Sequence, residues 1–397
     1  MFSHVAIPRL GIDVIQTGLT TTPSLEMAVI HSGADGGIMM SASHNPGDWN
    51  ALKLLNQKGE FISEEDGLWI KSQSQFPINS FSKVHELGNR IFVHDSIEKH
   101  VQAIIAHPLV NTDAIRERKF RIAADCINST GALALPVLFD ALNVDYQLMN
   151  ANNFGNFEHN PEPLAEHLQE LMELTKSQFD LGVAVDPDVD RLALIDEQGK
   201  YFGEEYSLVA VADYVLEKRP GNTVSNLSSS RALRDLTLQK GGKYFASPVG
   251  EVHVVHKMKE MNAVIGGEGN GGIILPDLHY GRDALIGIAL VLSNLCLKNC
   301  TLSALKKFYT EYAMQKDKLQ LDSNTNTDEL FQYLKENYSE YLINTIDGMK
   351  IDFEDGWVHI RKSNTEAIIR IYSEATSPAL AIEYVEHMKS LIIQYNS

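Results

Sequence analysis

The sequence is poor in cysteine, in long apolar runs and in positive charge, and each shortage excludes a class of protein. Its three cysteines, Cys126, Cys296 and Cys300, match no metal-binding spacing and are too few for a disulfide framework, which favours a reducing, cytoplasmic location. The longest apolar stretch, Ala284–Leu292, contains a glycine and is too short to cross a bilayer. The first residues lack the basic and apolar regions of a signal peptide.

The shortage of positive charge limits the partners. Lys and Arg number 34 against 52 Asp and Glu, so the net charge is −18. Because no block of basic residues is present, we expect neither nucleic acid nor an anionic membrane as a partner. The chain has 397 residues, 44% of them hydrophobic, which is enough for two to four domains with apolar cores.

Strand-type and helix-type segments alternate along most of the chain, which predicts an α/β fold with largely parallel sheets. The expected strands are 14–18, 36–40, 121–124, 181–185, 192–196, 223–227, 263–265, 357–360 and 368–372. The expected helices are 23–31 (capped by Thr22), 96–105, 132–142, 164–175, 207–218, 282–297 and 378–393. The polar stretch 319–328 is expected to be a linker or a hairpin tip.

A loop follows the expected strand 36–40 and places Ser43 directly before His44. A serine beside a histidine sets a weak nucleophile next to a group that can accept or donate a proton. The alternative is an ordinary polar turn after a strand.

A second loop carries Asp186, Asp188 and Asp190 between two apolar segments. Clustered carboxylates are hard oxygen ligands that suit Mg²⁺, and they would repel one another without a cation. The alternative is a solvated hairpin tip.

Two further loops have polar groups suited to a sugar phosphate. Residues 266–272 contain five glycines, which permit close approach to a ligand, together with Glu268 and Asn270. Residues 361–366 offer two cations, two hydroxyls and an amide, which could cradle a phosphate; the alternative is a β-turn with a surface ion pair. If these loops converge, they supply the groups needed for phosphoryl transfer.

The four motifs stand in the order found in the α-D-phosphohexomutase family, which includes phosphoglucomutases, phosphomannomutases and phosphoglucosamine mutases. They are Ser-Ala-Ser-His-Asn-Pro, Asp-Pro-Asp-Val-Asp-Arg, Gly-Glu-Gly-Asn-Gly and Arg-Lys-Ser-Asn-Thr-Glu. The resemblance implies an α/β fold of three βα domains with mixed, largely parallel sheets and a C-terminal α+β domain around a central cleft. The implied domains are 1–98, 99–201, 202–314 and 315–397.

The resemblance also implies roles for single residues. Ser43 would carry the phosphoryl group, and Mg²⁺ would be bound by Asp186, Asp188, Asp190 and an oxygen of phosphorylated Ser43. The remaining implied residues are His44, Lys53 and Arg191 beside the reacting groups, Glu268 and Asn270 at the sugar hydroxyls, and Arg361, Ser363, Asn364 and Thr365 at the second phosphate. The implied enzyme interconverts hexose 1-phosphate and 6-phosphate through a bisphosphorylated sugar, as a monomer or a homodimer.

The sequence departs from the family pattern in three places. Pro187 stands where glycine is common, and Asn270 where many members have serine. The family begins with an arginine-bearing strand that would precede Met1, so we expect an incomplete first domain. Two other functions stay open: a sugar-phosphate-binding protein without turnover, and a phosphatase with Asp186 as nucleophile, because an apolar strand ending in Asp-x-Asp resembles haloacid dehalogenases.

Overall fold

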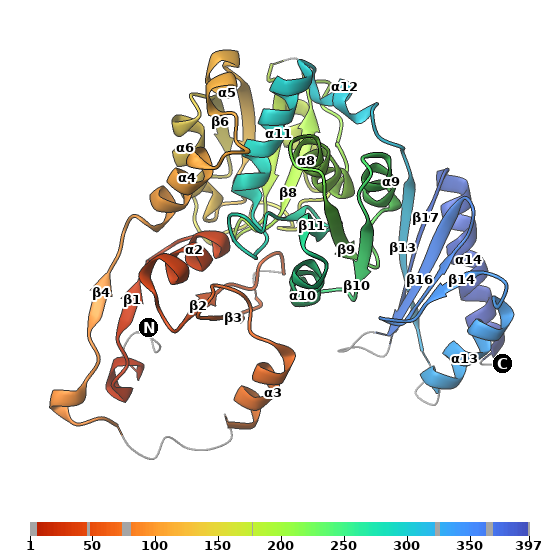
Figure 1. Ribbon diagram of the computed structural model, residues 1–397, viewed down its shortest axis with the longest axis horizontal. Coiled ribbons are helices and arrows are strands. Elements are labelled where there is room, and N and C mark those ends of the chain that lie inside the picture. The colour runs from red at the N-terminus through yellow and green to blue at the C-terminus, as the bar shows by residue number, and fades with distance from the viewer. Residues whose placement is uncertain are drawn as a thin grey trace. The chain divides into compact units, whose positions relative to one another are not determined.

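The computed structural model describes residues 6–45, 48–73, 81–176, 178–321, 326–362 and 368–395 (Figure 1). The chain divides into two compact units. The first contains Met1–Ser207 and Gly271–Ser303, and the second contains Leu208–Asn270 and Ala304–Ser397. Each unit is described by itself below.

The first part of unit 1 contains two small sheets. Its elements are η1 (Pro8–Leu10), β1 (Val14–Gln16), α2 (Thr22–Ser32), β2 (Gly36–Met40), β3 (Leu52–Asn56), α3 (Glu64–Gln73), η2 (Val84–Glu86) and β4 (Arg90–Phe92). Strand β1 pairs in parallel with β4, and β2 pairs antiparallel with β3. The predicted strand 36–40 is confirmed. The cap of α2 is Thr21, which accepts from Ser24 N–H, and not Thr22 as predicted.

The second part of unit 1 is built on a sheet of order β6-β5-β7-β8. Its elements are α4 (Ser96–Ala106), α5 (Thr112–Arg118), β5 (Arg121–Asp125), α6 (Gly131–Ala141), β6 (Asp145–Met149), α7 (Gln169–Thr175), β7 (Leu181–Val185) and β8 (Leu192–Asp196). Strand β5 lies parallel to β6 and β7, whereas β7 and β8 form an antiparallel pair. Every residue of β7 and β8 is buried, so the turn that joins them lies against the core.

Helix α7 is shorter than the sequence predicts. It begins at Gln169 instead of 164, because the preceding residues form turns. The N–H groups of His167 and Leu168 donate to carbonyls three residues back, to Leu164 and Ala165, and not four residues back as in an α-helix.

Unit 1 is completed by β12 (Gly272–Ile274) and α11 (Ala284–Lys298). Residues 284–295 of α11 are all buried, as expected for a helix that is apolar on every side. Asp283 caps its N-terminus by accepting from the N–H groups of Leu285 and Ile286. Helix α11 contacts α4, α5, α6 and β8.

Unit 2 begins within α8 (Glu204–Lys218) and contains a parallel sheet. Strand β9 (Asn222–Asn226) pairs in parallel with β10 (Tyr244–Ser247) and with β11 (Ala263–Glu268). The connecting helices are α9 (Arg231–Gln239) and α10 (Glu251–Met261), and α12 (Leu302–Lys306) leads back from α11.

The C-terminal part of unit 2 is an antiparallel sheet of order β13-β17-β16-β15-β14. Its elements are β13 (Ala313–Gln320), α13 (Thr327–Asn337), β14 (Leu342–Asn344), β15 (Met349–Asp352), β16 (Gly356–Lys362), β17 (Ile368–Ala375) and α14 (Pro378–Tyr395). Residues of α13 and α14 pack on one face of the sheet in a single apolar cluster (Figure 1). The predicted linker 319–328 is wrong at both ends, because β13 extends to Gln320 and α13 begins at Thr327.

These parts confirm the predicted fold class, which is α/β with mixed, largely parallel sheets and a C-terminal α+β part. Among the helices of the described ranges, none combines the length and apolarity needed to cross a bilayer.

Candidate active site

Ser43 stands directly after β2 in an uncommon backbone conformation. Its φ is 51°, in the left-handed region that residues other than glycine rarely adopt, and its N–H donates to Ser41 Oγ at 2.9 Å. The side chain is buried, and Oγ donates to Asp186 Oδ2 at 2.6 Å. The predicted serine and acidic loops therefore meet, and the serine hydroxyl faces the carboxylates. Pro46 and Gly47 of the same motif lie outside the described residues.

The acidic loop is the turn between β7 and β8. Asp186, Asp188 and Asp190 are almost fully buried, and their ligand oxygens all lie within 4.8 Å of one another. Asp186 Oδ1 accepts from the N–H groups of Asp190 at 3.0 Å and Arg191 at 3.1 Å, which closes the turn. The alternative of a solvated hairpin tip is wrong, because the carboxylates point into the protein.

Burying three carboxylates together is costly unless cations balance them. Burial and the charges of the other two aspartates raise the pKa of Asp186 well above its usual range. Burial alone would also raise the pKa of Asp190, but Arg282 and Lys53 lower it. Arg282 donates to Asp190 at 2.7 Å, and Lys53 Nζ lies 2.5 Å from Asp188 and 2.9 Å from Asp190. Lys53 comes from β3.

The loop also fits a divalent cation. Oδ1 of Asp188 and Oδ1 of Asp190 are buried and have no hydrogen-bond partner. Buried carboxylate oxygens are normally paired, so these two atoms are suited to ligate a cation. A set of carboxylate oxygens favours a hard ion such as Mg²⁺.

His44 lies between the serine and a guanidinium group. Its Nδ1 is 3.3 Å from Ser43 Oγ, and its Nε2 is 3.2 Å from Arg191 Nη2. Burial and the charge of Arg191 lower the pKa of His44 to about 4, so the ring is neutral. Because a guanidinium group can only donate, Nε2 must accept and Nδ1 must carry the proton. His44 therefore donates toward Ser43, and the group placed to accept the serine proton is Asp186.

Three contact residues escaped the sequence analysis. Thr22 Oγ1 donates to Asp188 Oδ2, Arg282 donates to Asp190, and Glu162 accepts from Arg191 Nη1 at 3.3 Å. They come from three segments far apart in the sequence and stand in no motif. Thr22 and Glu162 adjoin prolines, which indicated turns and caps and gave no sign of the acidic loop.

Unit 2 holds the other predicted residues that the structure describes. Glu268 is buried at the end of β11, where its Oε1 accepts from Asn226 Nδ2 at 2.9 Å and from Gly250 N–H at 3.1 Å. Gly250 has a φ of 120°, which favours glycine. Asn270 is half-buried beyond the same strand.

Arg361 is connected to this cluster through one carboxylate. Its Nε lies 2.8 Å from Asp347 Oδ2, which also accepts from the N–H of Val249 at 2.9 Å. Arg361 and Glu268 are therefore linked through two adjacent residues, because Val249 contacts Asp347 and Gly250 contacts Glu268. Ser363, Asn364 and Thr365 lie outside the described residues.

Four family models match most of the chain. Models of the phosphoglucomutase/phosphomannomutase alpha/beta/alpha domains I, II and III match residues 6–76, 98–199 and 203–312. The model of the C-terminal domain matches residues 298–390.

Two curated relatives and one solved structure illustrate the similarity. A phosphoglucomutase/phosphomannomutase of Thermococcus kodakarensis is 35% identical over 379 residues, 95% of this chain and 82% of that protein. A phosphoglucosamine/phosphogalactosamine mutase of Sulfurisphaera tokodaii is 31% identical over 96% of this chain and 86% of that protein. The crystal structure of a phosphoglucomutase/phosphomannomutase family protein from Burkholderia thailandensis has a TM-score of 0.81 at 25% identity and covers 97% of this chain and 83% of that one.

The acidic loop generates a direct test. We expect Mg²⁺ to raise the melting temperature of the wild-type protein, because a ligand that binds only the folded state stabilises it. In Asp188→Asn most of this Mg²⁺-dependent shift should be lost, because the variant lacks one ligand charge. Asp145→Asn, on the exposed surface of β6, is the control and should keep the shift. An equal shift in wild type and Asp188→Asn would contradict the assignment of the loop.

Proposed function

The chain belongs to the phosphoglucomutase/phosphomannomutase family, and on that premise we propose that Ser43 carries the phosphoryl group that it exchanges with a hexose phosphate. Membership makes the protein a phosphohexomutase, an isomerase. The proposed substrate is a hexose phosphate, and the phosphoryl group moves between the sugar oxygens at positions 1 and 6.

One observation carries the proposal for Ser43. Its hydroxyl is buried and donates to Asp186, a member of the acidic loop, at 2.6 Å. A serine held in a left-handed conformation needs support from its surroundings, and such strain is concentrated at functional sites. Phosphoryl transfer depends on positioning the nucleophile and on stabilising charge, and a serine beside carboxylates that can hold a cation is suited to both.

The proposed exchange has two half-reactions. In the first, a sugar hydroxyl oxygen bonds to phosphorus while the bond from phosphorus to Ser43 Oγ breaks, which gives a bisphosphorylated sugar. The proton that the attacking hydroxyl loses is balanced by the proton that Ser43 Oγ gains. In the second, Ser43 Oγ attacks the other phosphate, its proton is lost, and the sugar oxygen that leaves is protonated. The sugar must turn around between the two steps because both use the same serine.

The residues around Ser43 have separate tasks in this scheme. Asp186 accepts a hydrogen bond from the serine hydroxyl and so orients Oγ, and the neutral His44 donates a hydrogen bond from Nδ1 to the same oxygen. Lys53 and Arg191 bring positive charge to the site where phosphoryl oxygens carry negative charge. Asp186, Asp188 and Asp190 would hold Mg²⁺, which would supply further positive charge to those oxygens.

The unit 2 cluster is proposed to bind the sugar and the phosphate that is not transferred. Glu268 and Asn270 would bind sugar hydroxyls, and Arg361 with Ser363, Asn364 and Thr365 would bind the phosphate. The guanidinium group of arginine matches phosphate with two parallel hydrogen bonds. The relatives are named as mutases of glucose, mannose, glucosamine and galactosamine phosphates, so these four sugars form the panel to test.

The first experiment replaces the proposed nucleophile. Ser43→Ala should lower mutase turnover on the preferred sugar phosphate by ~10³-fold or more, because the covalent step disappears. Ser32→Ala is the control, since Ser32 is exposed on α2 and its hydroxyl contacts carbonyls of the same helix. Peptide mass spectrometry of the wild type should place a stable phosphate on Ser43.

Other outcomes of that experiment separate the alternatives. A phosphate that hydroxylamine removes, located on Asp186, would favour the phosphatase with an aspartate nucleophile. Tight binding of sugar phosphates without turnover by the wild type would favour a binding protein. Either result would contradict the role of Ser43.

A second experiment tests the phosphate contact. Arg361→Lys keeps the charge but loses the planar fork, so the Kd for hexose phosphate should rise by roughly tenfold. The control is Arg370→Lys, which should leave the Kd unchanged. Arg370 is exposed on strand β17, directly opposite Arg361 in the register of β16 and β17. Equal affinity of the wild type for free hexose and hexose phosphate, measured by calorimetry, would rule out a phosphate contact at Arg361.

A further inference from the structure

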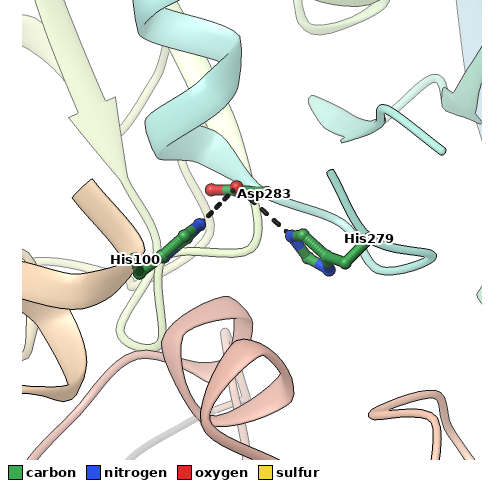
Figure 2. Close-up of side chains that lie close together, drawn as sticks. All are labelled: His100, His279 and Asp283. Carbon is green, nitrogen blue, oxygen red and sulfur yellow. Dashed lines mark hydrogen bonds and ion pairs between the residues drawn. The ribbon is translucent and has the colours of Figure 1, made fainter. Parts of the chain in front are cut away.

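A second buried cluster of ionisable side chains lies in unit 1 and is not used by the reaction (Figure 2). His279 lies between two carboxylates, with Nδ1 3.0 Å from Glu26 Oε2 and Nε2 3.3 Å from Asp283 Oδ2. His100 on α4 reaches the same Asp283 oxygen at 3.0 Å, and its Nδ1 lies 3.0 Å from Ser24 Oγ. All five side chains are buried. The chain of contacts therefore joins α2, α4, the 279–283 segment and the N-terminus of α11.

His279 is the cation of this cluster. Burial alone would lower its pKa, but hydrogen bonds to Asp283 and Glu26 raise it to about 10. The groups that face the ring are Glu26 from α2, Asp283 at the N-terminal cap of α11 and His100, whose ring lies edge-on with its centroid 5.8 Å away. Without the positive charge, two buried carboxylates would face each other unpaired, which is strongly unfavourable.

Close packing confirms that the 279–283 segment is pressed against α2. A Cβ atom at Gly281 would lie 1.8 Å from Glu26 Oε2. A larger residue at this position would therefore displace the Glu26 carboxylate from its place beside His279.

Helix α2 holds one side of the acidic loop. Thr22, one helical turn before Glu26, donates its N–H to the carbonyl of Asp188 at 2.9 Å and its hydroxyl to the Asp188 carboxylate. Any displacement of α2 at Glu26 would therefore move a contact of Asp188.

The two neighbours of Asp283 in the sequence, Arg282 and Ala284, contact the acidic loop as well. Ala284 N–H donates to the carbonyl of Val189 at 3.1 Å, and Arg282 donates to Asp190 Oδ2 at 2.7 Å. Val189 has a φ of 64°, a left-handed conformation that is unfavourable for a β-branched residue. A strained turn of this kind persists only when its surroundings impose it.

We propose that His279, by bridging Glu26 and Asp283, is a positioning residue that fixes the two segments holding the acidic loop and so sets the arrangement of its carboxylates. This rests on the proposed function of that loop as the cation site. His279 touches none of the three aspartates and acts through Thr22, Arg282 and Ala284. Residues that orient metal ligands without contacting the metal typically change metal affinity by ~10-fold or more when they are replaced. We expect the loss of the His279 bridge to weaken cation binding by a similar factor.

The cluster could instead bind a metal itself, because ligand atoms of His100, His279 and Asp283 lie within 4.8 Å of one another. The contacts favour the positioning role. Both ring nitrogens of each histidine already lie against a polar partner, and the described residues supply no fourth ligand to this group, whereas structural zinc sites have four.

The test measures the affinity of the 397-residue protein for Mn²⁺, as a probe of the proposed Mg²⁺ site, well below the melting temperature. Glu26→Gln keeps an acceptor for His279 but removes the charge, and should raise the Kd of Mn²⁺ by ~10-fold. His279→Gln should also raise the Kd of Mn²⁺ by ~10-fold. If His279→Gln does not fold, the double variant Glu26→Gln/His279→Gln takes its place in the measurement, because it leaves fewer buried charges unpaired. The KM for hexose phosphate should stay unchanged while kcat falls.

Asp213→Asn is the matched control. Asp213 is buried in unit 2, where it pairs with Lys240 and Tyr309, far from the acidic loop in the chain. It should lower the melting temperature without changing the Kd of Mn²⁺. If Glu26→Gln behaves like Asp213→Asn, the role of His279 is structural only and the proposal is overturned.

Two further outcomes are decisive. If Asp188→Asn weakens Mn²⁺ binding while Glu26→Gln and His279→Gln do not, the positioning proposal fails and the proposed cation site stands; if Asp188→Asn also has no effect, both fail. Elemental analysis of the purified protein provides the other check. A stoichiometric transition metal that is lost in His279→Gln but kept in Asp188→Asn would make the cluster a metal site and overturn the positioning role.

Discussion

Three carboxylates buried in one turn are the constraint on which this site depends. The turn joins β7 and β8, which are wholly buried, so Asp186, Asp188 and Asp190 cannot escape into water. Their charges are costly in that position unless cations lie against them. Lys53 and Arg282 supply part of this positive charge from the protein itself. The oxygens Oδ1 of Asp188 and Oδ1 of Asp190 have no hydrogen-bond partner and can therefore ligate a bound cation.

The same constraint explains the strained backbone nearby. Ser43 and Val189 both have left-handed φ values, and each makes a hydrogen bond with another segment, Ser43 Oγ with Asp186 and the Val189 carbonyl with the N–H of Ala284. The Ser43 hydroxyl donates to Asp186, and Val189 stands between Asp188 and Asp190, whose ligand oxygens lie within 4.8 Å of each other. In both places local backbone preference is overruled by tertiary contacts, which is the pattern expected where geometry serves chemistry.

The sequence was informative where the signal is local. The apolar runs of β2, β7 and β8 predicted those strands with their observed bounds, and the motifs predicted that Ser43 and the three aspartates belong to one site. It was uninformative where contacts are long-range. Arg282 lies 92 residues from its partner Asp190, and no local pattern encodes that pairing. The protonation state of His44 depends on Arg191, 147 residues away, so the neighbouring Ser-His pair alone left open whether the histidine accepts or donates, and the structure places a donor there.

The central claim is that a phosphoserine at Ser43 lies beside a cation bound by the acidic loop. Phosphorus-31 NMR of the phosphorylated protein tests it most directly, because bound Mn²⁺ broadens the signal of a phosphate within its reach. The account predicts that stoichiometric Mn²⁺ broadens the phosphoserine resonance beyond detection in the wild type and leaves it sharp in Asp188→Asn. A phosphoserine resonance that stays sharp in the wild type at saturating Mn²⁺ would contradict it.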